Sequence, residues 1–305
     1  MVNEIHRRLS RIPLFAGRPA SAFSIEPMGG LTNTNHKVTL DGQSYVLRIA
    51  GRGIGETIDR RAEETNIAII APTGINAEVL FMDPSDGLQL TRFVNDARTL
   101  EIGDFEDLET VCRAARLLRR VHAVAQPFAT AFDVFAMIDG YLERLLAIRG
   151  RIPAGFADIA EEVEAVRRVF AANPAVLVPC HCDPLPDNFL VSGRAMYLID
   201  WEYAGNNDPM WDLGDLAVEA EFDARRDGVL LAAYFDGEAA AGQAGRMAIY
   251  KALSDLLWSL WADIQVAEGN SVAQFQAYGK ARLERCKAAM AAGRFAEHLK
   301  AVGDG

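Results

Sequence analysis

One short stretch constrains the fold of this chain more than any other feature. Residues 181–188 read His-Cys-Asp-Pro-Leu-Pro-Asp-Asn, and two apolar runs separated by Ser192-Gly193 then lead to Asp200. This pattern predicts a loop, a strand, a hairpin turn and a second strand that ends at an acid. It therefore sets Asp183, Asn188 and Asp200 in a fixed order. Phosphoryl transfer from ATP uses such a set: one carboxylate for the acceptor hydroxyl, an amide oxygen for metal, and a second carboxylate that bridges Mg²⁺ to the phosphates.

The spacing within this stretch is more informative than its single residues. A lone Asp in a loop is more often a turn former or a helix cap than a catalytic group. Here, however, His181-x-Asp183-x₄-Asn188 has the spacing of the kinase catalytic loop, and Asp200 stands where kinases place a metal-binding acid. We therefore predict Asp183, Asn188 and Asp200 as catalytic residues, with Asn188 and Asp200 as Mg²⁺ ligands and ATP as the phosphoryl donor.

The same region carries a family resemblance. The segments Asp183-Pro184-Leu185-Pro186-Asp187-Asn188, Ile199-Asp200-Trp201-Glu202-Tyr203-Ala204-Gly205 and Asp208-Pro209-x₂-Asp212-Leu213 resemble the choline/ethanolamine kinase family. That family belongs to the aminoglycoside-phosphotransferase group, whose fold is that of protein kinases. The resemblance runs from about Met28 to Tyr278. It implies an α+β, two-lobed protein-kinase-like fold, with a small, mostly antiparallel β lobe containing one main helix and a larger, mainly α-helical lobe.

Periodicity along the chain predicts the same order of elements. Asp41-Gly42 between two apolar alternating runs is a strong hairpin signal. From about residue 95 the apolar period changes from that of strands to that of helices. We place the boundary there and expect a nucleotide-binding lobe over 1–94 and a catalytic and substrate-binding lobe over 95–305. The predicted strands are 23–25, 36–40, 45–49, 79–82, 88–94, 189–191 and 196–199, and the predicted helices are 3–14, 59–70, 108–121, 135–149, 156–172 and several from 211 to the end.

Three features are predicted to bind the nucleotide. The loop with Gly30, Thr32 and Asn33 could cover the phosphates with its backbone amides. It lacks the Gly-x-Gly-x-x-Gly spacing, so an ordinary turn is the alternative, but the family carries a similar Gly-Gly-Leu-Thr-Asn segment. The resemblance also implies that Arg48 binds phosphate, since its planar fork suits phosphate oxygens, and that Glu63 holds it.

Two details of this nucleotide site stay open. Glu64 adjoins Glu63 on the same predicted helix, and either acid could pair with Arg48. Phe93 and Val94 are expected to form the hinge whose backbone groups meet adenine, although their side chains are also typical of core residues.

The predicted helix that carries Trp258 and Trp261, with residues expected near it, indicates which acceptor the protein binds. Trp258 and Trp261 are three residues apart, hence on one helix face, where two tryptophans are most often core. Choline kinases, however, bind the trimethylammonium group with an acid after the Asp-Leu motif and a Trp-x-x-Trp pair, and Glu219 with Trp258 and Trp261 matches both. Glu202, Tyr203 and Tyr278 complete the predicted substrate-binding set.

Two further polar residues are given structural roles. Asp212 is expected to brace the catalytic loop as a buried acceptor or to cap a helix. His122, at the end of a leucine-rich helix, is expected to be a structural histidine near that loop.

Cys180-His181-Cys182 has no second Cys/His pair at zinc spacing, so reduced, partly buried thiols are expected.

Composition narrows the class of protein. A net charge of −11 over 305 residues argues against nucleic-acid binding. No apolar run approaches a membrane span, and the first residues lack a signal-peptide core. We expect a cytoplasmic enzyme without membrane or nucleic-acid partners, with a small cationic alcohol as substrate; a homodimer is compatible with the sequence.

The predicted reaction is phosphorylation of the hydroxyl of choline or a related amino alcohol such as ethanolamine. One alternative is a kinase for another acceptor in the same superfamily, such as an aminoglycoside, thiamine or a sugar. The other is a catalytically silent pseudokinase that serves as a binding module.

Overall fold

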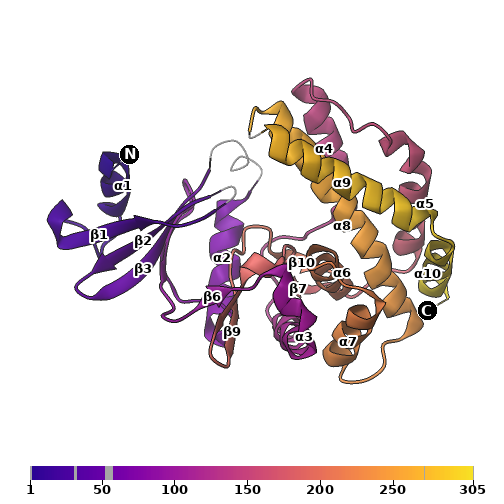
Figure 1. Cartoon of the computed structure of the whole chain (residues 1–305), viewed down its shortest axis with the longest axis horizontal. Helices are drawn as coiled ribbons and strands as arrows, with labels where there is room; N and C mark the ends of the chain where they lie inside the picture. Colours follow the sequence, from indigo (N-terminus) through magenta and orange to yellow (C-terminus); the bar gives the residue numbers. More distant parts are fainter. Residues whose placement is uncertain (1, 31–32, 52–57, 271, 305) are drawn as a thin grey trace. The chain divides into compact units, whose positions relative to one another are not determined.

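The computed structural model describes residues 2–30, 33–51, 58–270 and 272–304 (Figure 1). By its internal contacts the chain divides into two compact units. The first unit comprises Met1–Arg98 and Leu190–Glu202, and the second comprises Thr99–Phe189 and Tyr203–Gly305. The chain thus leaves the first unit and returns to it once for a short hairpin.

The first unit is built on an antiparallel sheet of five strands in the order β1-β2-β3-β5-β4. The Asp41-Gly42 turn between β2 and β3 has φ of 50° and 77°, as the predicted tight hairpin requires. The strands, in chain order, are β1 (Phe23–Pro27), β2 (Thr34–Leu40), β3 (Gln43–Ile49), β4 (Val79–Asp83) and β5 (Leu88–Arg92). The helix α2 (Arg60–Ile70) lies between β3 and β4 in the chain.

The short helix α1 (Val2–Leu9) packs on this sheet (Figure 1). Ile5, Leu9, Ile12 and Phe15 form one buried cluster with apolar side chains of β2, β3 and β5. The predicted helix over 3–14 was too long: it ends at Leu9, whose carbonyl cannot receive a helical hydrogen bond from Pro13 because proline has no backbone N–H.

The hairpin that returns to the first unit consists of β8 (Phe189–Ser192) and β9 (Ala195–Leu198). These strands match the two apolar runs predicted before Asp200. The sequence pattern missed β6 (Arg98–Thr99), which pairs with β8 and has only two residues. The strand predicted over 88–94 ends at Arg92, although the amide of Phe93 still donates to Ser44 O at 3.1 Å.

The second unit is mainly helical (Figure 1). The long helix α8 has α9 packed along it and also contacts α4, α6 and α10. A short antiparallel pair, β7 (Val178–Cys180) with β10 (Gly205–Asn207), interrupts the helices and was not predicted. The helices are α3 (Leu108–His122), α4 (Val134–Ala147), α5 (Ala160–Ala172), α6 (Pro209–Glu219), α7 (Ala224–Phe235), α8 (Ala241–Ala267), α9 (Val272–Ala291) and α10 (Gly293–Gly303).

The predicted helix over 156–172 was also too long. Its first residues, Phe156–Asp158, form a 3₁₀ turn, Ile159 leaves helical geometry with φ of −119° and ψ of 0°, and α5 starts only at Ala160. Within the residues that the structure describes, no helix has the length and apolar character needed to cross a membrane.

Candidate active site

In the first unit, two arginines and three acids form a buried arginine–carboxylate network: Arg48, Arg60, Glu63, Asp200 and Glu202. Arg48 on β3 donates to Glu63 Oε1 at 2.5 Å and to Asp200 Oδ1 at 3.1 Å. Arg60 at the start of α2 donates to Glu63 Oε2 at 2.7 Å and to Glu202 Oε2 at 2.6 Å. With every group ionised, three carboxylates against two guanidiniums leave one negative charge, which suits a cation such as Mg²⁺.

This network decides between the two neighbouring acids of α2. The side chain of Glu63 is fully buried against Arg48 and Arg60, whereas Glu64 is exposed. The pairing of Arg48 with Glu63 is therefore the one present. Arg60 was missed by the sequence analysis; the signal was its place one helical turn before Glu63.

Asp200 has the backbone and electrostatic features of a functional residue. Its φ of 66° lies in the left-handed region, which is costly for an aspartate and is common at active sites. Burial, and then the nearby carboxylates of Glu202 and Glu63, raises the pKa of Asp200 to about 7, while Arg48 and Arg60 act in the opposite direction. About a third of its side-chain surface is still exposed, so its carboxylate remains accessible.

The predicted phosphate loop is tied to the same network. Asn33 Nδ2 donates to Glu202 Oε1 at 3.2 Å, and Asn35 Nδ2 donates to the carbonyl of Gly29 at 3.1 Å. A Cβ atom on Gly30 would lie 2.2 Å from the carbonyl oxygen of Asn33, so only glycine fits there. Thr32 lies outside the described residues.

Three other predicted residues of the first unit are described by the structure. Glu202, predicted to bind substrate, is held in the network by Arg60 and Asn33. Phe93 and Val94 follow β5 directly and are half-buried, and Lys37 Nζ lies 4.7 Å from the Phe93 ring centroid. Their hinge role stays a prediction.

In the second unit, Asp183 and Asn188 belong to one compact loop. Asn188 Nδ2 donates to the carbonyl of Asp183 at 2.8 Å, and the Leu185 amide donates to that same carbonyl at 3.0 Å. This bond fixes the amide nitrogen of Asn188 toward the loop, so Oδ1 is the atom that can ligate a metal. Asp183 is half-buried and Asn188 is buried.

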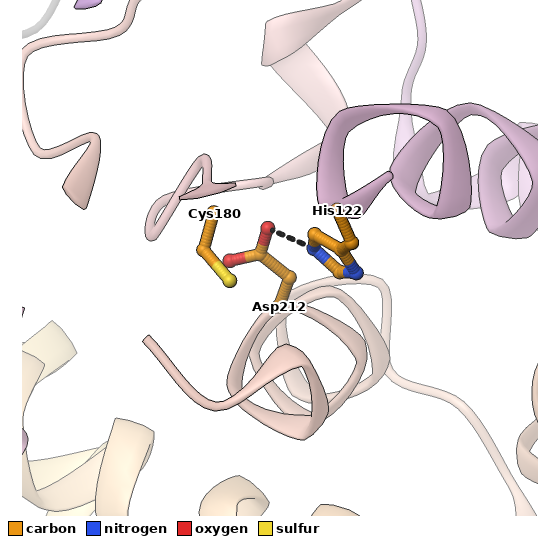
Figure 2. Close-up of side chains that lie close together, drawn as sticks. All are labelled: His122, Cys180 and Asp212. Atoms are coloured by element: carbon orange, nitrogen blue, oxygen red, sulfur yellow. Dashed lines mark hydrogen bonds and ion pairs between the residues drawn. The ribbon is translucent and has the colours of Figure 1, made fainter. Parts of the chain in front are cut away.

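Asp212 on α6 braces this loop, as predicted. Its two oxygens accept hydrogen bonds from the backbone amides of His181 and Cys182, both at 2.8 Å. Oδ2, the oxygen that accepts from His181, also accepts from His122 Nε2 at 2.9 Å (Figure 2). Cys182 has a φ of 68°, and its carbonyl accepts a hydrogen bond from Trp211 Nε1 at 3.0 Å. The residues just before Asp183 are thus clamped in a strained conformation by α6.

His122, Cys180 and Asp212 also place three potential metal-ligand atoms within 4.8 Å of one another (Figure 2). His122 uses both ring nitrogens, since Nδ1 pairs with the Tyr234 hydroxyl at 2.8 Å. Burial raises the pKa of the Cys180 thiol well above its usual value, which disfavours the thiolate that metals bind. The cluster is a hydrogen-bonded brace, and the expected structural role of His122 is confirmed. The expectation of reduced thiols also agrees with the structure, in which the four cysteines are free.

The aromatic residues predicted to bind the acceptor form one contiguous cluster in the second unit. Tyr203 meets Trp258 edge to face with ring centroids 5.3 Å apart, and Trp258 meets Trp261 at 6.3 Å. Trp261 in turn meets Tyr278 at 6.4 Å and Phe275 at 5.3 Å. Trp258 and Trp261 are 5% and 7% exposed, so these contacts alone do not separate a binding surface from core.

The carboxylates beside this cluster are arranged differently from expectation. Glu219 is already paired with Arg282 of α9, whose guanidinium also lies 5.0 Å from the Tyr278 ring centroid. Asp215, one turn before Glu219 on α6, accepts hydrogen bonds from Trp258 Nε1 at 3.0 Å and from Ser254. Sequence reasoning gave Asp215 no binding role and did not single out Arg282, which could have been noticed one turn after Tyr278 on the same helix.

Comparison with known proteins identifies the family of this chain. Residues 25–250 match the model of the phosphotransferase enzyme family. The structure resembles a choline/ethanolamine kinase family protein from Mesorhizobium loti, with 41% identity, full coverage of both chains and a TM-score of 0.87. The chain belongs to the choline/ethanolamine kinase family.

Other solved structures support the same family. The choline kinase LicA from Streptococcus pneumoniae is 28% identical over 95% of this chain and 98% of its own, with a TM-score of 0.82. A LicA structure in complex with AMP is 28% identical over 95% of this chain and 97% of its own, with a TM-score of 0.81. This choline/ethanolamine kinase family member is therefore a phosphotransferase that acts on an alcohol group, and the predicted protein-kinase-like α+β fold is confirmed.

Proposed function

We propose that this protein transfers the γ-phosphoryl group of ATP to the hydroxyl of choline. The observation that carries the choice of acceptor is the aromatic cluster of Tyr203, Trp258, Trp261 and Tyr278 with buried carboxylates beside it. A quaternary ammonium gains attraction from indole faces and needs no hydrogen-bond acceptor. Bulky polyol acceptors have no use for such a cluster, whereas the LicA relative is a choline kinase.

In this proposal Asp183 orients the acceptor hydroxyl and takes its proton. The acceptor oxygen forms a bond to the γ-phosphorus while the bond from that phosphorus to the β–γ bridging oxygen breaks, and ADP leaves. The Asp212 brace fixes the backbone that carries Asp183, which limits the geometric freedom of this step.

The nucleotide is assigned to residues of the first unit. In this proposal Arg48, which donates a hydrogen bond to Glu63, neutralises phosphate oxygens with its fork. Gly30 and Asn33 belong to the loop assigned to the phosphates. The complex of LicA with AMP supports adenine nucleotide as the donor.

Asp200 and Asn188 fit the chemistry of Mg²⁺, which prefers carboxylate and amide oxygens. The carboxylates of Glu202 and Glu63, which crowd Asp200 and raise its pKa, create a repulsion that a bound cation would relieve. Bound there, Mg²⁺ would neutralise charge on the phosphates.

A coupled assay of ADP release tests this function with choline, ethanolamine, thiamine and an aminoglycoside on one enzyme preparation. We expect choline to give the highest kcat/KM. If ethanolamine gives the highest kcat/KM, the proposed substrate changes from choline to ethanolamine within the same family. If none of the four compounds causes ADP release, a catalytically silent binding module is favoured.

A further inference from the structure

Arg60, at the start of α2, holds two buried acids of the arginine–carboxylate network with one guanidinium nitrogen. Its Nη1 donates to Glu63 Oε2 at 2.7 Å and to Glu202 Oε2 at 2.6 Å. The side chains of these three residues are at most 8% exposed. Hydrogen bonds between ionised groups are shorter and stronger than those between neutral groups, so this buried pairing fixes where the carboxylate of Glu202 lies.

Arg48 is a second possible partner for the same carboxylate oxygen. Arg48 Nη1 lies 4.0 Å from Glu202 Oε2, at the limit of an ion pair, whereas Arg60 Nη1 lies 2.6 Å from that oxygen. Arg48 already pairs with Glu63 and with Asp200. The structure therefore gives Glu202 to Arg60 and leaves Arg48 with two close acid partners instead of three.

We propose that Arg60 is a positioning residue for nucleotide binding: it holds Glu202 away from Arg48, and the fork of Arg48 thereby stays available to phosphate oxygens. The inference rests on the proposed function, in which Arg48 meets the phosphates, and it requires no contact between Arg60 and the ligand. Without Arg60, Glu202 would keep its bond from Asn33 but lose its close cation. A buried carboxylate needs a cation, and the guanidinium of Arg48, 4.0 Å away, would take that place.

The turn between β4 and β5 leaves room for Arg60. Gly87 in this turn has a φ of 70°, and a Cβ atom there would lie 2.8 Å from Arg60 Nε and 3.1 Å from Arg60 Cδ. Because two acids hold the guanidinium, the side chain cannot move aside without disturbing those bonds. Gly42, in the turn between β2 and β3, has a similar φ of 77° but no atom within 4 Å of its Cβ position. The two glycines thus differ in their contact with Arg60 and not in their backbone conformation.

The test is isothermal titration calorimetry of the full chain with ADP in EDTA, where no metal contributes to binding. Arg60→Gln should raise the Kd for ADP by at least about 10-fold, because Glu202 then competes with the phosphates for Arg48. Arg61→Gln is the matched control, since it removes the same charge from the exposed next residue of α2 and should change the Kd by less than about two-fold. In steady-state kinetics, Arg60→Gln should raise the KM for ATP more than the KM for choline.

A second substitution separates this role from a loss of packing or of overall charge. Glutamine at position 202 cannot compete for Arg48 as an ion, so Arg60→Gln with Glu202→Gln should bind ADP within about two-fold of Glu202→Gln alone. Arg60→Gln with Glu64→Gln removes an exposed acid of the same helix instead and should bind as weakly as Arg60→Gln. Wild-type ADP affinity in Arg60→Gln, no recovery with Glu202→Gln, or equal recovery with Glu64→Gln would overturn the proposal.

If Arg60→Gln does not fold, Gly87→Ala decides, because it displaces Arg60 without removing its charge. It should weaken ADP binding by roughly three-fold relative to Gly42→Ala, and equal affinities in these two variants overturn the proposal. Wild type that binds no ADP would refute both the assignment of the nucleotide and this inference. Wild type that binds ADP but does not phosphorylate choline would refute the proposed acceptor and leave the role of Arg60 to the variants.

Discussion

The brace between α6 and the catalytic loop gives the sharpest prediction for mutation. Asp212 accepts hydrogen bonds from the amides of His181 and Cys182 and from His122 Nε2. Replacing Asp212 by Ala leaves three buried donors without a partner. At about 1–1.5 kcal/mol each, the free energy of unfolding should fall by roughly 3–5 kcal/mol, a large share of the ~5–15 kcal/mol typical of a native protein.

The same substitution should also slow the reaction. Without the carboxylate, Cys182 keeps only the hydrogen bond from Trp211 Nε1 to its carbonyl to support its positive φ, and the loop can relax toward ordinary backbone. A displacement of the neighbouring Asp183 by ~1 Å costs on the order of 100-fold in rate. Asp212→Asn, which keeps one acceptor oxygen, should be milder, with a loss of about 2 kcal/mol in stability and an intermediate kcat.

Urea denaturation and steady-state kinetics with ATP and choline measure both effects. Asp208→Asn is the control: Asp208 caps the same helix at the Met210 amide and pairs with Arg246, and neither partner belongs to the catalytic loop. It should lose stability with little change in kcat. If Asp208→Asn and Asp212→Asn lower kcat equally at a temperature where both are folded, the brace has no catalytic effect and the reasoning fails.

Three further predictions concern the reaction itself. Asp183→Asn should lower kcat by about 10²–10⁴ with ATP still bound, the usual scale for loss of a general base, and near-wild-type turnover would remove Asp183 from the mechanism. Asp200→Ala should abolish turnover at every Mg²⁺ concentration; recovery at high Mg²⁺ would contradict the assignment of a ligand essential to the reaction. Trp258→Leu or Trp261→Leu keeps apolar bulk but loses the ring face, so the KM for choline should rise roughly ten-fold, and unchanged kinetics in both would mean that these tryptophans are core.

Much of the fold follows from local sequence signals. The Asp-Gly hairpin, the alternation over Tyr45–Ile49 and the helical period after residue 107 depend on residues near one another in the chain, and the structure has elements at each. The errors were at element ends: Pro13 removes a helical donor after α1, and Ile159, with φ of −119°, interrupts the backbone before α5, whereas the apolar period alone would continue the helix in both places. Strands of two or three residues, such as β6 and β7, carry too few side chains to show a period.

For the candidate site, too, some features could be predicted from the sequence and others required the structure. The order and spacing of Asp183, Asn188 and Asp200 predicted the chemistry, since that pattern is contained within one short stretch. The choice of Glu63 over Glu64 required the structure, because adjacent helical residues differ by about 100° in direction and only packing sets which one faces Arg48.

The hydrogen-bond and ion-pair partners of Glu219 and Asp215 are the part of the site that the sequence predicts least well. Glu219 and Arg282 are 63 residues apart, and Asp215 and Trp258 are 43 apart. The net charge of a buried site depends on which charged groups lie within a few ångströms of one another. A local sequence pattern does not show which distant residues come that close. The sequence by itself determined the family, the fold class and the likeness to a kinase catalytic loop. Only the tertiary structure, by packing α9 against α8 and α6 against α8, decided that Glu219 is neutralised by Arg282 and that Asp215 keeps an unpartnered oxygen.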